Sequence, residues 1–78
     1  MPEIKQYDIR EIDWPMSILN CKKQVDQMKS GERLNVIVND IDVANTLITL
    51  LGNLTGIRIE TRTREAYTTL IINKYEAV

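Results

Sequence analysis

The sequence contains no histidine, and its only cysteine is Cys21. Without histidine, the chain has neither histidine-dependent acid–base catalysis nor zinc sites built from cysteine and histidine. A single cysteine cannot close a disulfide within the chain, which is typical of a reducing compartment. The sequence also lacks a glycine-rich phosphate loop, an EF-hand and any other metal motif. We therefore expect no metal and no other cofactor.

Long apolar runs are also missing, since no stretch approaches the roughly 18 apolar residues of a membrane span. Residues 1–5 have neither the apolar region nor the small-residue cleavage site of a secretory signal. These absences predict a cytoplasmic protein without a membrane partner. The net charge of −1 provides no overall attraction to nucleic acid, so a partner must be recognised by a local surface.

The length of 78 residues predicts a single domain over residues 1–78. A chain of this size buries only somewhat more than ~60 % of its unfolded surface, so we expect modest stability. Its content of 44 % apolar and 27 % charged residues is ordinary for a soluble globular protein.

Apolar periodicity predicts two helices, over residues 15–29 and 42–53. Apolar side chains at steps of three and four in the first helix are Ile18, Cys21, Val25 and Met28. This stripe is expected to face a sheet, and Gly31 is expected to close the helix in the left-handed conformation. The second helix has a wider apolar arc and begins after Asp40 or Asp42, either of which can cap it.

Four strands are predicted over residues 4–9, 33–39, 57–63 and 67–73, because apolar and polar side chains alternate there. The polar first strand suits a sheet edge. The resulting order, β-α-β-α-β-β, predicts an α/β two-layer sandwich in which two helices cover one face of a mixed four-stranded sheet. Residues 76–78 are expected to be a frayed tail.

The segment Trp14-Pro15-Met16-Ser17 lies where the first strand gives way to the first helix. The order and spacing of elements from residue 7 to residue 74 resemble the TusA/SirA-like sulfur-carrier family. Further points of resemblance are Pro15, the Gly31-Glu32 turn, Asp40 and Gly56. Members of that family carry a persulfide received from a cysteine desulfurase. The resemblance implies this fold, together with a cysteine desulfurase or another sulfur-relay protein as partner.

The family opens its first helix with Cys-Pro-x-Pro, and this chain departs from that pattern at three positions. Trp14 replaces the nucleophilic cysteine, Ser17 replaces the second proline, and Glu11 replaces a glycine. Persulfide chemistry cannot be carried over without the cysteine. The resemblance therefore implies a divergent, non-catalytic member that acts through protein–protein contact.

We expect the binding surface around the sole tryptophan to be an apolar patch with a basic edge. Its residues are Trp14, Pro15, Met16, Leu19 and Lys23. Tryptophan is enriched among the residues that dominate binding energy in interfaces. Two alternatives remain open, because the indole ring could instead cover the end of the helix pair and Leu19 could contact the second helix.

Two further candidate sites each have a structural alternative. Cys21 would be a displaced persulfide site if its thiol were accessible, but a cysteine on a core stripe is more often a buried apolar residue. The second is an RNA- or tRNA-binding stripe, whose residues would be Arg33, Arg58, Arg62 and Arg64. Glu60 and Glu65 interrupt this stripe, which favours a solvated sheet face over a nucleic-acid site.

Overall fold

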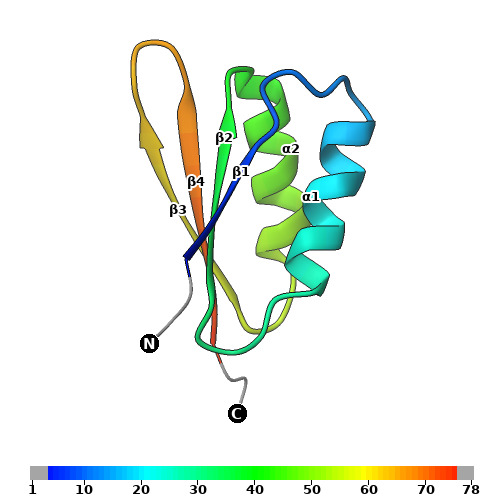
Figure 1. Cartoon of the computed structure of the whole chain (residues 1–78), viewed down its shortest axis with the longest axis vertical. Coiled ribbons are helices and arrows are strands. Elements are labelled where there is room, and N and C mark those ends of the chain that lie inside the picture. The colour runs from blue at the N-terminus through cyan, green and yellow to red at the C-terminus, as the bar shows by residue number, and fades with distance from the viewer. Residues whose placement is uncertain (1–3, 76–78) are drawn as a thin grey trace.

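The computed structural model describes residues 4–75 and has the predicted order of elements. The bounds are β1 Ile4–Asp8, α1 Met16–Asp26, β2 Arg33–Val38, α2 Ile41–Gly52, β3 Ile57–Thr63 and β4 Thr68–Lys74. Both helices lie side by side on one face of a single open sheet (Figure 1). The predicted α/β two-layer sandwich is therefore confirmed. The predicted tail, residues 76–78, lies outside the described residues.

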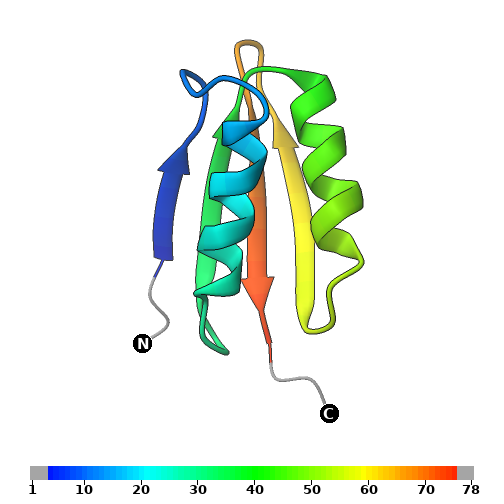
Figure 2. The same ribbon diagram turned by 90° about the vertical axis from the view of Figure 1, so that its right-hand side faces the viewer.

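The sheet has the order β1-β2-β4-β3, so β4 lies between β2 and β3 (Figure 2). The strands β1 and β2 run parallel, and the other two pairs are antiparallel. The first strand is an edge strand, as its polar sequence predicted. The carboxyl ends of the parallel pair reach the same end of the sheet, and a helix begins after each of them.

The core lies between the sheet and the two helices, and it follows the predicted periodicity. The apolar stripe from Ile18 to Met28, which begins in α1 and continues just past its end, is buried throughout. Its partners in the core from the second helix and the two central strands are Ala44, Leu47, Leu51, Leu34, Val36, Val38, Leu70 and Ile72. Register assigns Ile71 to the opposite face of β4, where it is still only 9 % exposed.

The first helix is shorter than predicted, since it ends at Asp26 rather than at residue 29. The amide of Met28 donates to the carbonyl oxygen of Val25, three residues back, so the chain leaves the α-helical hydrogen-bond pattern here. Gly31 does have the expected positive φ, +89°. It serves the turn into β2, where its N–H donates to the carbonyl oxygen of Lys74 at 2.7 Å, and it does not close the helix.

Smaller shifts affect four other elements. The strands β1 and β2 each end one residue earlier than predicted, at Asp8 and Val38. The second helix spans Ile41–Gly52, one residue earlier than predicted, because Asp40 and not Asp42 is its N-cap. The last strand spans Thr68–Lys74, one residue later than predicted.

Neither helix within residues 4–75 has the length and apolar character needed to cross a membrane.

Candidate functional site

The turn that joins β1 to α1 is anchored by backbone and side-chain contacts. Ile9 is buried, and its N–H donates to the carbonyl oxygen of Ile37 at 3.0 Å. The carboxylate of Asp8 accepts hydrogen bonds from the backbone N–H of Arg10 and, at 2.7 Å, from its guanidinium. Asp8 is the last residue of β1, and its carboxylate holds the first part of the turn through Arg10. These contacts fix the path of the chain toward Trp14.

The beginning of α1 relies on backbone hydrogen bonds, because no side chain caps it. The N–H of Ser17 donates to the carbonyl oxygen of Asp13. The N–H groups of Ile18 and Leu19 both donate to the carbonyl oxygen of Pro15. Pro15 is the N-cap, so the first helical residue is Met16 rather than Pro15. The peptide bond between Trp14 and Pro15 is cis.

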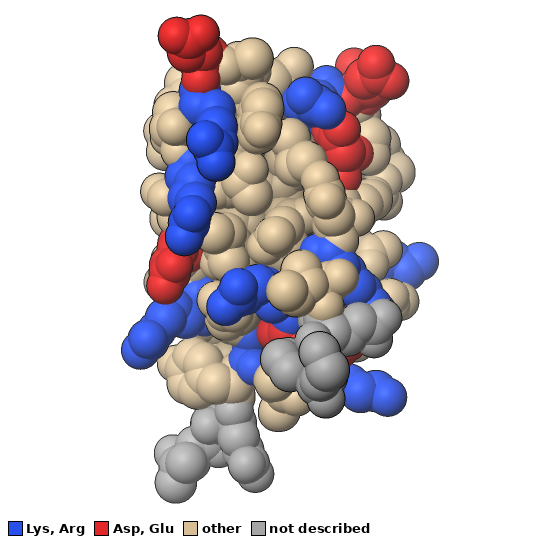
Figure 3. All heavy atoms as spheres, turned by 60° about the vertical axis from the view of Figure 1, so that its left-hand side comes forward, with Lys and Arg blue, Asp and Glu red and all other residues tan. Residues whose placement is uncertain are grey.

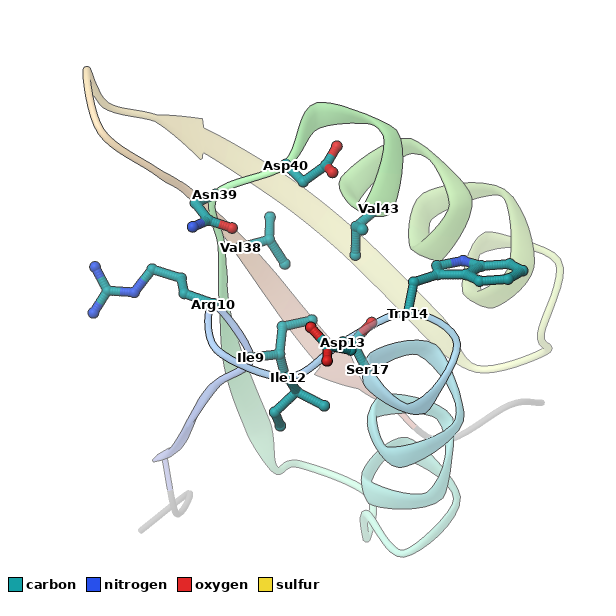
Figure 4. A pocket seen from close by; sticks show the side chains of 10 residues that line it. All are labelled: Ile9, Arg10, Ile12, Asp13, Trp14, Ser17, Val38, Asn39, Asp40 and Val43. Carbon is teal, nitrogen blue, oxygen red and sulfur yellow. The ribbon is translucent and has the colours of Figure 1, made fainter.

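Trp14 is 67 % exposed, so its indole ring does not cover the end of the core. In Figure 4 the ring points away from the other labelled side chains. Met16 is 51 % and Leu19 is 57 % exposed, which leaves most of the Leu19 side chain outside any contact with α2. Pro15 and Lys23 are exposed as well.

Met16, Leu19 and Lys23 follow one another at steps of three and four, so they are neighbours along one solvent-facing side of α1. Trp14 and Pro15 lie at the beginning of this row. We call these five residues the docking ridge: Trp14, Pro15, Met16, Leu19 and Lys23. The structure thus brings the predicted binding residues together on one side of the molecule.

A hollow of about 200 Å³ lies behind the turn, between the first residues of α1 and the segment that joins β2 to α2 (Figure 4). Its walls include four apolar side chains. These are Ile9, Ile12, Val38 and Val43. Trp14, Arg10, Asn39 and two carboxylates, Asp13 and Asp40, also line it.

Ser17 is the unusual member of this lining, because its side chain is 1 % exposed and its hydroxyl has no hydrogen-bond partner within residues 4–75. The side chain lies in the first turn of α1 and points into the hollow (Figure 4). Leaving a buried hydroxyl unpaired costs about 1–3 kcal/mol. The sequence identified Ser17 only as a departure from a family motif, since burial and the loss of a hydrogen-bond partner carry no sequence signal.

The charges around the hollow are mainly negative. Asp40 caps α2 by accepting from the N–H of Asp42 at 2.8 Å, and Asp13 belongs to the turn. The guanidinium of Arg10 instead pairs with Asp8 and lies 5.4 Å from the ring centre of Tyr67. This hydrogen bonding lowers the pKa of the Asp8 carboxyl to about 2 and raises the pKa of Arg10. The one nearby arginine is thus engaged elsewhere.

Cys21 lies in the core with none of its surface exposed, four residues after Ser17 on the same helix. Burial disfavours the charged thiolate and raises the pKa of the thiol from 9.0 to about 12. A persulfide carrier needs a thiolate that its donor can reach. No contact of Cys21 supports the displaced persulfide site.

The arginine stripe lies on the sheet face that the helices leave uncovered. Arg58 and Arg33 flank Asn73 in one row of the sheet, and the guanidinium of Arg33 donates to the side-chain oxygen of Asn73 at 2.9 Å. Figure 3 shows blue side chains along one edge of the molecule, interrupted by red ones, beside a broad uncharged middle. Glu60 lies between Arg58 and Arg62 on β3, so the stripe is discontinuous as the sequence indicated.

No family model, curated protein or solved structure matches this chain. Within residues 4–75, no three histidine, cysteine, aspartate or glutamate side chains gather closely enough to hold a metal ion.

Proposed function

We propose that this protein is a non-catalytic interaction module that binds another protein through the docking ridge. The observation that carries the proposal is the exposure of its sole tryptophan, 67 %, next to two apolar side chains that are each more than half exposed. A single exposed apolar residue needs no explanation, but three in one row make a patch of the kind that marks interfaces. Tryptophan is also among the residues that most often dominate binding energy.

The charges at the two ends of the docking ridge indicate which surface a partner would need. Asp13 and Glu11 are exposed near Trp14, whereas Lys23 lies at the other end of the ridge. A complementary segment has an apolar centre that covers Trp14, Met16 and Leu19 and a basic end that faces the turn. The resemblance to TusA/SirA-like proteins suggests a cysteine desulfurase or another sulfur-relay protein as this partner.

The first experiment uses the fact that Trp14 is the only tryptophan in the chain. Incorporation of a fluorinated tryptophan gives one fluorine NMR signal, which reports directly on the ridge. Addition of a purified cysteine desulfurase should shift or broaden that signal. Isothermal titration should then show that Trp14→Ala weakens binding at least ~30-fold, the effect of losing about 2 kcal/mol.

A matched control is Leu50→Ala, because Leu50 is 39 % exposed on the other helix and lies outside the ridge. This variant should bind like the unmodified protein. Trp14→Ala binding with unchanged affinity would contradict the docking ridge. If the desulfurase does not bind the unmodified protein, the sulfur-relay partner is wrong.

A further inference from the structure

We infer that the hollow beside Trp14 receives a lysine side chain of the docked partner. This inference rests on the proposed function, because it describes one contact that a partner on the docking ridge would make. Trp14 belongs to both the ridge and the lining of the hollow, so a segment bound to the ridge passes its opening.

The size of the hollow suits one side chain. Its volume of about 200 Å³ is smaller than the roughly 300–1,000 Å³ of pockets that bind drug-sized ligands or cofactors. The apolar walls, made by Ile9, Ile12, Val38 and Val43, match an aliphatic stem. Lysine buries such a stem along apolar surface while its ammonium group remains among polar groups.

The polar groups of the hollow call for a hydrogen-bond donor with a positive charge. Asp13 and Asp40 present carboxylates, and the buried hydroxyl of Ser17 has an unused acceptor. An ammonium group has three donors and no acceptor, so it can satisfy Ser17 and a carboxylate together. An apolar guest would leave the Ser17 hydroxyl unpaired, and a carboxylate would be repelled by Asp13.

Two features argue against an anion, although two helices begin here and helix N-termini attract negative charge. The first-turn N–H groups of Ser17, Ile18 and Leu19 already donate to backbone oxygens. The N–H of Asp42 is taken by the cap residue Asp40. An anion would therefore find few free donors and would meet two carboxylates.

Lysine fits better than arginine for a geometric reason. Arginine recognises a carboxylate best through two parallel hydrogen bonds that use both oxygens. One oxygen of Asp40 already accepts from Asp42, and the compact ammonium needs only a single oxygen from each acceptor. Arginine is accordingly one of the probes in the test.

The test needs no partner. Amide NMR spectra of the labelled protein are recorded during titration with N-acetyl-lysine methylamide, and again with the norleucine and arginine analogues. We expect saturable shifts at Asp13, Ser17 and Val43 with the lysine probe, and a dissociation constant at least fivefold higher with either analogue. Equal shifts with the norleucine probe, tighter binding of the arginine probe or no saturable shift would overturn the inference.

Substitutions locate the site. Asp13→Asn and Ser17→Ala should each weaken binding of the lysine probe several-fold, up to about tenfold. Asp26→Asn is the matched control, because Asp26 lies on the same helix but pairs with Lys22 at its exposed end. Thermal unfolding of each variant confirms that it is folded, and an unchanged affinity in a folded Asp13→Asn variant would contradict the site.

Failure of this inference can be distinguished from failure of the proposed function. Leu19→Ala should retain the lysine probe, because Leu19 lies on the docking ridge and does not line the hollow, and should still weaken binding of the partner. A partner lost on Trp14→Ala without any binding of the lysine probe would leave the docking ridge standing and remove the lysine site. Binding of the lysine probe, with no effect of Trp14→Ala on binding of the partner, would leave the lysine site standing and remove the docking ridge.

Discussion

Ile18 and Leu19 are neighbours in the sequence but lie in opposite environments. Ile18 is 8 % exposed within the stripe that faces the sheet, whereas Leu19 is 57 % exposed on the docking ridge. One helix therefore carries two surfaces, one that stabilises the fold and one that is free for a partner. The apolar content of α1 therefore exceeds what its contacts with the core use.

The largest expected effect concerns Cys21, on the buried side of this comparison. Its pKa of about 12, against an ordinary 9.0, predicts about a thousandfold less thiolate in the folded than in the unfolded chain near pH 8. Iodoacetamide should therefore label the native protein about a thousandfold more slowly, as followed by mass spectrometry. Equal labelling rates, or a sulfur atom gained from a desulfurase, would contradict the buried thiol.

The same shift has a consequence for stability. The neutral thiol is favoured by the folded state, so its contribution is fully present below pH 9 and is lost as pH rises toward 12. Cys21→Ala should remove this part of the alkaline loss of stability, which chemical denaturation at a series of pH values would measure.

The second prediction concerns the neighbours Ile18 and Leu19. Ile18→Ala should lower the free energy of unfolding by about 2–5 kcal/mol, since it removes a buried side chain and leaves a cavity. Leu19→Ala should change it by less than about 0.5 kcal/mol, as for other exposed positions. Urea denaturation of both variants checks this, and similar losses would contradict the division of α1 into two surfaces.

The two helix beginnings provide the third prediction. Asp40→Ala removes the side chain that caps α2 and should cost about 1 kcal/mol. Asp13→Ala should cost less than about 0.5 kcal/mol, because the start of α1 has no side-chain cap. A loss of equal size in both variants, measured by urea denaturation, would mean that Asp13 supports α1 in a way its contacts do not indicate.

The smallest effect concerns Asp8, which is exposed. Its carboxyl should titrate near pH 2 in NMR spectra rather than at its ordinary 3.8, because Arg10 donates hydrogen bonds to the charged form. The contribution of this pair to stability is present above pH 3.8 and declines as pH falls toward 2. Arg10→Gln should return the midpoint toward 3.8, and an unchanged midpoint would assign the shift to another cause.

Periodicity was sufficient for the elements and the core, because stripes such as Ile18 to Met28 depend only on neighbours along one helix. It failed at the end of α1, where Met28 remains in the core although the helix ends at Asp26. The exposure of Trp14 was left open, since a turn residue has no periodic face.

The hollow could not be predicted from the sequence, for a different reason. Its lining comes from the turn, from α1 and from the segment after β2, which the fold alone brings together. The orientation of Arg10 toward Asp8 and Tyr67 likewise depends on contacts across the sheet. No local pattern indicated that Ser17 would be buried without a partner.

The central position of β4 determines when the molecule can fold during its synthesis. Strand β3 has no partner other than β4 within the sheet, and β2 has only the edge strand β1 until β4 arrives. A nascent chain emerging from the ribosome therefore holds β3 without a strand partner until β4, which ends at Lys74, has left the exit tunnel. Folding is expected to follow the emergence of β4 in one late step, and factors that shield nascent chains would act on this protein before then.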